Sequence, residues 1–252
     1  MSEMRVQKYL SKAGVCSRRE GEELMEAGRV TVDGEVCDEL GSKVDPEAEV
    51  AVDGEVVDLP DTYTYVLLNK PADCITTLDD PQGRETVMDW VPDALPRLWP
   101  VGRLDRETTG ALLLTNDGDL THRLTHPSFG ARKYYRAVVE GEIQSEGALA
   151  DRFTGGIELD DGDTARAQSV EIDRAEGGQS ELSIVLTEGQ NRQIRRMCDA
   201  VGHPVVELER TAIGPIGLGD LGPGEWRRLN PDEVAELYDE VDTDPPDRAP
   251  AE

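Results

Sequence analysis

The most unusual part of the chain is residues 100–128, PVGRLDRETTGALLLTNDGDLTHRLTHPS. Asp105 lies between Arg103 and Arg106, and the apolar run ALLLT that follows predicts a buried strand. Guanidinium groups beside a carboxylate favour its ionised form, which makes Asp105 a candidate nucleophile or anion at neutral pH. The alternative is a surface ion pair in a turn, which an isolated Arg-x-Asp-Arg pattern also fits.

Two further segments place basic residues beside apolar or aromatic side chains. In residues 188–203, EGQNRQIRRMCDAVGH, three arginines are packed into five positions, and their forked guanidinium groups suit phosphate or carboxylate. In residues 131–141, ARKYYRAVVEG, Lys133 and Arg136 flank two tyrosines, a mixture that suits a stacked RNA base. The structural alternatives are a solvated helix face and an ordinary strand with one tyrosine in the core.

The chain is strongly acidic, with 53 Asp and Glu against 26 Lys and Arg, a formal net charge of −27. Such a charge repels polyphosphate over most of the surface, which speaks against nucleic-acid binding for the chain as a whole. The charge is uneven, because 100–136 holds six Lys or Arg against four acids, whereas 231–252 holds nine acids and one Arg. We interpret the composition as an acidic, halophile-like surface suited to high salt, where screening weakens repulsion.

Several classes of protein are disfavoured by the sequence. The four Cys and three His show no CxxC pair or other metal spacing, so neither a metal site nor a disulfide framework is expected. The N-terminus lacks the pattern of a signal peptide, and no run approaches 18 apolar residues. We therefore expect a cytoplasmic protein with no membrane partner.

The predicted organisation is α+β, with a small N-terminal unit at 1–60, a larger unit at 61–238 and a tail at 239–252. The larger unit mixes strand-like and helix-like runs too irregularly for a βαβ series. The tail is rich in acids and proline and is expected to be disordered.

Local signals in the small unit are clear. Two helices are expected within 4–27, the second opened by the capping-box pattern of Ser17 and Glu20. Asp-Gly pairs at 33–34 and 53–54, each inside an alternating run, predict two hairpins.

In combination, these motifs resemble those of ribosomal RNA pseudouridine synthases of the RsuA/RluB type. The motifs run in order from about residue 4 to about 237: QKYLSKAGVCSRREGEELMEAGRVTVDGEV, NKP at 69–71, GRLD at 102–105, KYY at 133–135 and NRQIRRM at 191–197. The resemblance implies an S-four-like RNA-binding domain at 1–60 and a catalytic domain at 61–238 with a mixed, mainly antiparallel sheet. One departure is Asp73, where the family usually has Gly, and it puts the local turn in doubt.

The resemblance also implies the chemistry. Pseudouridine formation breaks the N-glycosidic bond of uridine, turns the flipped-out base and rejoins it to ribose through carbon 5. Nothing is oxidised or hydrolysed overall, so no cofactor and no metal is expected. The family's nucleophile falls on Asp105, and Arg195 matches the arginine that pairs with it. Tyr135 matches the tyrosine that stacks on the uracil, and it is a candidate for removing the carbon-5 proton; Tyr134 ranks below it.

Further residues are expected to contact a ribosomal RNA or pre-ribosomal particle, bound by a monomer. Arg103 and Arg106 are candidates to steer the flipped nucleotide and contact its phosphates. The other expected substrate-binding residues are Lys70, Lys133, Arg192 and Ile194. In the small domain, the basic residues expected to bind the RNA backbone without sequence specificity are Lys8, Lys12, Arg18, Arg19 and Arg29. A solvated helix pair is the alternative there.

Segments such as LLLTNDGDLTHRLTHPS resemble the large-subunit (23S) branch more than the small-subunit branch, so large-subunit RNA is the expected substrate. The alternatives are the same reaction on small-subunit (16S) RNA, a non-catalytic RNA-binding ribosome-assembly factor, and a glycosidase that pairs Asp105 with Glu107 or Asp117. The presence of Asp105, Tyr135 and Arg195 speaks against the assembly factor. Nothing in the sequence places two carboxylates across one sugar, as a glycosidase requires.

Overall fold

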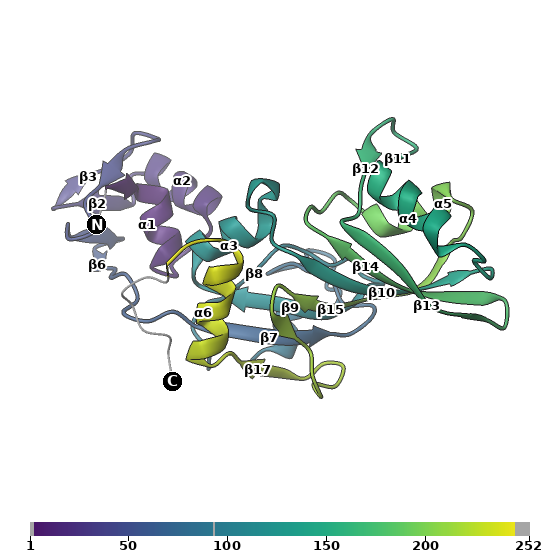
Figure 1. The fold of residues 1–252 in the computed structure, drawn as a ribbon. Helices are drawn as coiled ribbons and strands as arrows, with labels where there is room; N and C mark the ends of the chain where they lie inside the picture. The colour runs from purple at the N-terminus through teal and green to yellow at the C-terminus, as the bar shows by residue number, and fades with distance from the viewer. Residues whose placement is uncertain (1–2, 93, 245–252) are drawn as a thin grey trace.

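The computed structural model describes residues 3–92 and 94–244. They form a small N-terminal unit and a larger unit built on a nine-stranded sheet (Figure 1). This sheet is antiparallel at every pairing except that of β15 with β9. The predicted α+β class with a mixed, mainly antiparallel sheet is confirmed. No helix in the described part of the chain is long and apolar enough to cross a membrane.

The small unit packs two helices against short strands. Its elements are β1 (Met4–Arg5), α1 (Val6–Lys12), α2 (Arg18–Glu26), β2 (Val30–Val32), β3 (Glu35–Val36), β4 (Lys43–Val44), β5 (Val50–Val52) and β6 (Glu55–Val56). The predicted capping box opens α2, because Ser17 Oγ accepts the Glu20 amide and the Glu20 carboxylate accepts the Ser17 amide. Leu10, Met25 and Val30 are fully buried between the helices and the sheet.

Both predicted hairpins are confirmed. Asp33 and Gly34 connect β2 to β3, and Asp53 and Gly54 connect β5 to β6. All four residues have positive φ, as a type I′ turn requires. The two hairpins join through β2 and β5 into one four-stranded sheet, which accounts for the near repeat of VDGEV in the sequence.

The large sheet has the order β13-β14-β10-β15-β9-β7-β17, with β16 paired to β15 and β8 paired to β9. Its strands are β7 (Tyr65–Lys70), β8 (Trp99–Pro100), β9 (Thr109–Thr115), β10 (Lys133–Glu140), β13 (Ser169–Glu176), β14 (Gln179–Leu186), β15 (Val205–Ile213), β16 (Ile216–Gly217) and β17 (Trp226–Arg228). A separate short pair is formed by β11 (Ile157–Glu158) and β12 (Thr164–Ala165).

The parallel contact between β9 and β15 depends on a glycine. Gly110 pairs with Arg210 and has a φ of 105°, a conformation that side chains disfavour. A Cβ on Gly110 would overlap the Arg210 backbone. The buried Arg210 side chain in turn donates from Nε to the Ala111 carbonyl at 2.7 Å. This close approach joins the two halves of the sheet directly after the segment that carries Asp105.

Helices cover both halves of the sheet (Figure 1). On β7 and β9, the alternating residues Tyr65, Leu67 and Leu113 share a core with α3 and α6, while Val66 and Leu112 pack on the opposite face, where η1 lies. On the other half, α4 and α5 pack against β10, β13 and β14. The helical elements are η1 (Val87–Trp90), α3 (Gly118–Thr125), η2 (Pro127–Phe129), α4 (Glu146–Gly155), α5 (Gln193–Ala200) and α6 (Pro231–Glu240).

The folded part of the larger unit extends past residue 238. The predicted boundary at 238 falls inside α6, and Val241 is buried in the same core as that helix. Folded structure therefore includes the first residues of the predicted tail. The remainder of that tail, from 245, lies outside the described residues.

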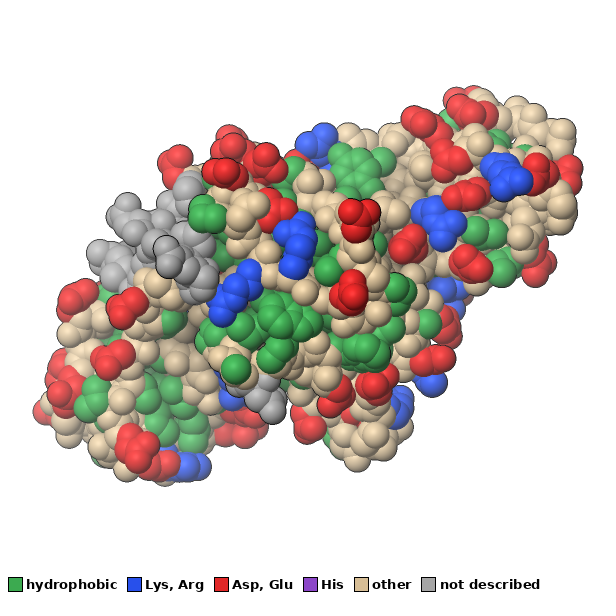
Figure 2. All heavy atoms as spheres, turned by 90° about the horizontal axis from the view of Figure 1, so that it is seen from below, with side chains coloured by type: hydrophobic (Ala, Val, Ile, Leu, Met, Phe, Trp, Pro, Cys, Tyr) green, Lys and Arg blue, Asp and Glu red, His purple; other side chains and the backbone are tan. Residues whose placement is uncertain are grey.

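Acidic side chains are spread from one end of the molecule to the other on the face shown in Figure 2, with Lys and Arg between them. Many Lys and Arg side chains of the protein form ion pairs with Asp or Glu. Arg132 forms an ion pair with Glu240 at 2.6 Å, and Arg227 pairs with Glu233 at 2.7 Å. The acidic composition is therefore a property of the surface, and it also neutralises a large share of the arginines.

Candidate active site

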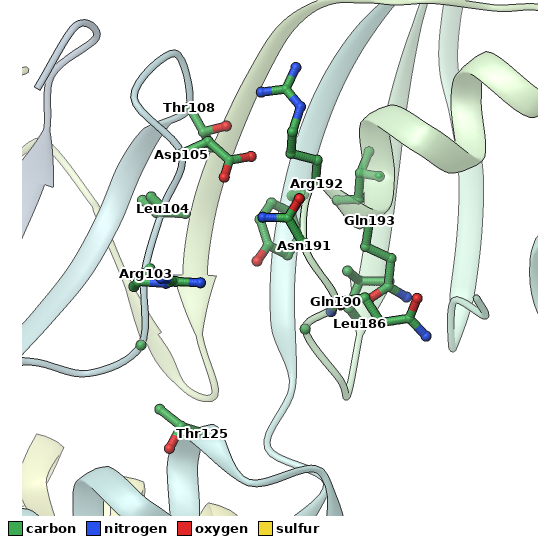
Figure 3. A pocket seen from close by; sticks show the side chains of 14 residues that line it. Arg103, Leu104, Asp105, Thr108, Thr125, Leu186, Gln190, Asn191, Arg192 and Gln193 are labelled. Carbon is green, nitrogen blue, oxygen red and sulfur yellow. Dashed lines mark hydrogen bonds between the residues drawn. The ribbon is translucent and has the colours of Figure 1, made fainter. Parts of the chain in front are cut away.

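A cavity of about 270 Å³ lies where three segments of the large unit meet. Most of its wall comes from the loop before β9, one side chain from β10, and the loop that joins β14 to α5 with the start of α5, and Thr125 of α3 completes it. Of the expected site residues, the cavity brings together Arg103, Asp105, Tyr135, Arg192 and Ile194. Figure 3 shows Asp105 and Arg192 on facing walls. The volume lies close to the lower end of the roughly 300–1,000 Å³ range of small-molecule pockets, so the cavity suits a small ligand.

The Asp105 loop is held from behind by Lys70, whose side chain is fully buried. Its Nζ donates to the carbonyls of Pro71 at 2.9 Å, Arg106 at 3.2 Å and Thr108 at 2.9 Å. Burial lowers the pKa of Lys70, although nearby acidic groups including Asp105 oppose this effect. The expected role of Lys70 in binding substrate is not supported, because all three donors are used within the protein. Lys70 is a positioning residue.

Thr76 braces the same loop and was not found by the sequence reasoning. Its Oγ1 donates to the Leu104 carbonyl at 2.8 Å and accepts the Leu104 amide at 3.2 Å. The Asp105 carbonyl accepts the Thr108 amide at 3.0 Å, which closes a tight turn at Asp105. Lys70 and Thr76 together therefore fix the backbone on both sides of Asp105, as preorganised catalysis requires.

The expected ion pair between Asp105 and Arg195 is not formed in this structure. Arg195 is mostly buried, with its Nε 3.9 Å from a carboxylate oxygen of Glu107. Glu107 also accepts a hydrogen bond from Arg192 at 3.1 Å, and this bond, with the charge of both arginines, lowers the pKa of Glu107. Among the described residues, no Lys or Arg forms an ion pair with Asp105 within 4.0 Å. Glu107 is the competing anion, and the sequence reasoning assigned it no such role.

Tyr135 and Ile194 form the apolar part of the cavity together with Leu104 and Leu186. Tyr135 lies on β10 between the two core clusters of the large unit, and Ile194 is buried at the start of α5. Tyr134 lines a different hollow, beside β15 and β16, as expected from the alternation of side chains along a strand. The preference for Tyr135 over Tyr134 therefore agrees with the geometry.

Two expected contacts of substrate lie outside the cavity wall. Lys133 donates to the Ala131 carbonyl at 3.1 Å, and burial together with the charge of Arg210 lowers the pKa of Lys133 to about 8. Arg106 forms an ion pair with Asp73 at 3.1 Å. Asp73 has a φ of 61°, the left-handed region that favours glycine, so the departure noted in the sequence occurs where a turn needs that conformation.

The polar wall of the cavity includes Gln190, Asn191 and Gln193, which the sequence reasoning passed over. Gln193 is buried and bonded to Glu188 and to the Arg166 carbonyl, so it shapes the loop. The Asn191 amide lies between the two walls in Figure 3 and offers donors and an acceptor to a ligand. The signal was present as the NRQ run at the start of the basic cluster.

The basic residues of the small unit do not form one continuous surface free of ion pairs. Lys8 and Lys12 both bond to Asp119 at the start of α3, at 2.8 and 2.7 Å, and so tie the small unit to the large one. Arg29 is paired with Asp53. The last two of the five expected residues, Arg18 and Arg19, are exposed on α2. The predicted RNA-binding face is therefore reduced to these two arginines.

Comparison with known proteins identifies the family. Residues 64–200 match the family model described as RNA pseudouridylate synthase, and residues 4–50 match the S4 domain. The chain belongs to the RNA pseudouridylate synthase family. The matched region contains Asp105, Tyr135 and Arg195, so the family resemblance of the sequence motifs is confirmed.

Relatives of the synthase match it over nearly its whole length. An uncharacterized RNA pseudouridine synthase of Aquifex aeolicus (strain VF5) is 45% identical over 243 residues, which cover 96% of each chain. The ribosomal large subunit pseudouridine synthase B of Bacillus subtilis (strain 168) is 40% identical, covering 92% of this chain and 95% of that protein. A solved pseudouridylate synthase has a TM-score of 0.67 at 27% identity, covering 93% of this chain and 99% of the other.

Proposed function

We propose that the synthase isomerises a specific uridine of large-subunit (23S) ribosomal RNA to pseudouridine, with Asp105 as the nucleophile. One observation carries the proposal: Asp105 lies on a loop fixed by Lys70 and Thr76 and lines the same cavity as Tyr135 and Ile194. A carboxylate without an ion-pair partner among the described residues is free to attack, and covalent catalysis needs such a group held in place.

The cavity accounts for the steps of the isomerisation. The target uridine leaves its helix and enters the cavity, where Tyr135 and Ile194 contact the faces of the base. Asp105 takes part in breaking the glycosidic bond, the uracil turns, and carbon 5 bonds to the ribose while its proton leaves. Overall one C–N bond is exchanged for one C–C bond, and the carbon-5 proton is replaced by one on nitrogen 1. The mostly buried Arg195 lies close to Glu107, which belongs to the same loop as Asp105.

The choice of RNA rests on similarity. The Bacillus subtilis relative is named for the large ribosomal subunit, and it matches the synthase over almost its whole length. The partner we propose is accordingly ribosomal RNA or a pre-ribosomal particle in the cytoplasm. The same reaction on small-subunit (16S) RNA is the alternative that the cavity fits equally well.

The glycosidase alternative requires a second carboxylate opposite Asp105, and the two candidates, Asp117 and Glu107, are engaged in other contacts. Asp117 is 1% exposed, accepts the Tyr65 hydroxyl at 2.9 Å and caps the start of α3. Glu107 is bonded to arginine. Neither carboxylate is placed as the acid or base that a glycosidase needs opposite Asp105.

A tritium-release assay tests the proposed function. Ribosomal RNA carrying 5-tritiated uridine should lose tritium with the wild-type enzyme and not with Asp105→Ala or Asp105→Asn. Release that is unaffected by these changes would refute the role of Asp105. Mapping pseudouridine in ribosomal RNA from a strain that lacks the gene would then name the modified position, and a lost site in 16S instead of 23S RNA would reverse the choice of substrate.

A further inference from the structure

An exposed cluster of aromatic and basic side chains lies on α3 and η2, and the cavity wall does not include it. The ring centroids of His122 and His126 are 5.2 Å apart, and those of His122 and Phe129 are 5.7 Å apart in an edge-to-face arrangement. The guanidinium carbon of Arg123 lies 5.1 Å from the centre of the Phe129 ring. Four side chains therefore form one contiguous group, which we call the α3 platform: His122, Arg123, His126 and Phe129.

The composition of the chain makes the α3 platform unusual. The protein has only three histidines and two phenylalanines, and two of the former and one of the latter meet here. Both histidines are exposed, and Phe129 is only half-buried. In a chain of net charge −27, Arg123 forms no ion pair with any carboxylate among the described residues. His126 caps η2, since its Nδ1 accepts the Ser128 amide, and both histidine rings nevertheless remain exposed.

The α3 platform adjoins the candidate active site through α3 itself. Thr125 lies on α3 between the platform residues and lines the cavity. Figure 3 shows Thr125 at the edge of the cavity, on the same side as Arg103. A Cβ on Gly102 would lie 3.4 Å from the Thr125 methyl group, so the end of α3 touches the segment that carries Asp105. A chain that leaves the cavity past Thr125 would therefore run close to α3, the helix that carries His122 and Arg123.

We propose that the α3 platform binds an unpaired nucleotide of the RNA that flanks the uridine in the cavity, by stacking its base on the exposed rings. The proposal rests on the proposed function, because it takes the ligand of the cavity to be a nucleotide of a longer RNA. Proteins recognise single-stranded RNA by stacking splayed bases on His, Phe or Arg planes. Arg123 supplies the positive charge that the adjoining phosphate needs.

Variants of exposed residues test the proposal on the full chain. Stacking on one ring contributes roughly 1–3 kcal/mol per base, so His122→Ala should weaken binding of an unmodified ribosomal RNA transcript at least about fivefold. Arg123→Gln should weaken it as well. We expect KM to rise by the same factor, with kcat and the unfolding temperature unchanged. The matched control is His203→Ala, since His203 lies at the far end of β10, bonded to the Glu140 carbonyl.

Ultraviolet cross-linking separates this proposal from the proposed function. Zero-length cross-links between the wild-type protein and unmodified 16S and 23S transcripts should map to the peptide that contains residues 122–129. Tritium release without such cross-links, and with unchanged affinity in His122→Ala, overturns the α3 platform while the proposed function stands. Cross-links at 122–129 in a protein that releases no tritium support the platform and refute the proposed function.

Discussion

Replacing Lys70 with Met tests whether this lysine holds the catalytic loop or binds substrate. Methionine keeps a long apolar side chain in the buried site but removes the donors to the carbonyls of Pro71, Arg106 and Thr108. Each orphaned carbonyl costs roughly 1–3 kcal/mol. Removing a charge whose pKa is already lowered by burial offsets part of this cost. The expected net loss of unfolding free energy is about 3 kcal/mol.

Urea unfolding followed by circular dichroism measures the loss. The control is Lys43→Met, which removes an exposed lysine of the small unit and should change the stability by less than about 0.5 kcal/mol. Displacing the Asp105 loop by about 1 Å should lower kcat about 100-fold in the tritium-release assay, with little change in KM. The reasoning is refuted if Lys70→Met keeps the stability and kcat of the wild type and raises only KM, because that pattern belongs to a substrate contact.

Four other outcomes are expected. Partial burial raises the pKa of Asp119, but the hydrogen bonds from Lys12 and Lys8 outweigh it and hold that pKa at about 2. Because this pKa is lowered, the contact stabilises the fold above about pH 4 and is lost as the pH falls towards 2. Asp119→Asn should therefore cost about 1 kcal/mol at neutral pH, a value reduced for the half-exposed carboxylate, and should remove that acid dependence from urea unfolding curves. Arg195 does not line the cavity but lies against Glu107 beside the Asp105 loop, so Arg195→Ala should nearly abolish turnover and leave RNA affinity mostly intact, whereas an equal loss of both would indicate a phosphate contact. Tyr135→Phe keeps the stacking ring, so full tritium release by this variant would exclude a proton-transfer role for the hydroxyl. RNA affinity measured against salt should fall less steeply than for a basic RNA-binding protein, because few phosphates are contacted, and a steep slope would contradict this.

Features encoded by neighbouring residues were predictable from the sequence. The capping box of Ser17 and Glu20 and the turns at 33–34 and 53–54 require only side chains and backbone a few residues apart. The family motifs likewise placed Asp105 and Tyr135, which the fold brings into one cavity. Short-range signals therefore sufficed for the capping box and the two turns, and the family motifs for two residues of the cavity.

Features that depend on distant contacts were not predictable. The donors of Lys70 reach carbonyls 36 and 38 residues away, and these contacts turn an expected substrate ligand into a support for the loop. Lys12 likewise meets Asp119 across 107 residues, so a base expected to face RNA faces the other unit of the protein. Glu107 lies within the quoted motif, yet its effect depends on Arg192, 85 residues on. Charge alone did not identify these partners, since the sequence offers many acidic residues that could pair with each arginine or lysine.

The same abundance of acids explains how so acidic a chain can keep a site for RNA. Ion pairs neutralise many of the basic residues, as Glu181 and Glu209 do for Arg136 on β10 and Glu107 does for Arg192 in the cavity wall. Among the residues that the structure describes, Arg103 at the cavity and Arg123 beside it form no ion pair with a carboxylate. Some positive charge that phosphate can reach therefore remains beside the cavity, as it does at the exposed Arg18 and Arg19 of α2, while the surrounding acids repel RNA over much of the surface. In this chain, the large negative charge restricts where RNA binds and does not prevent its binding.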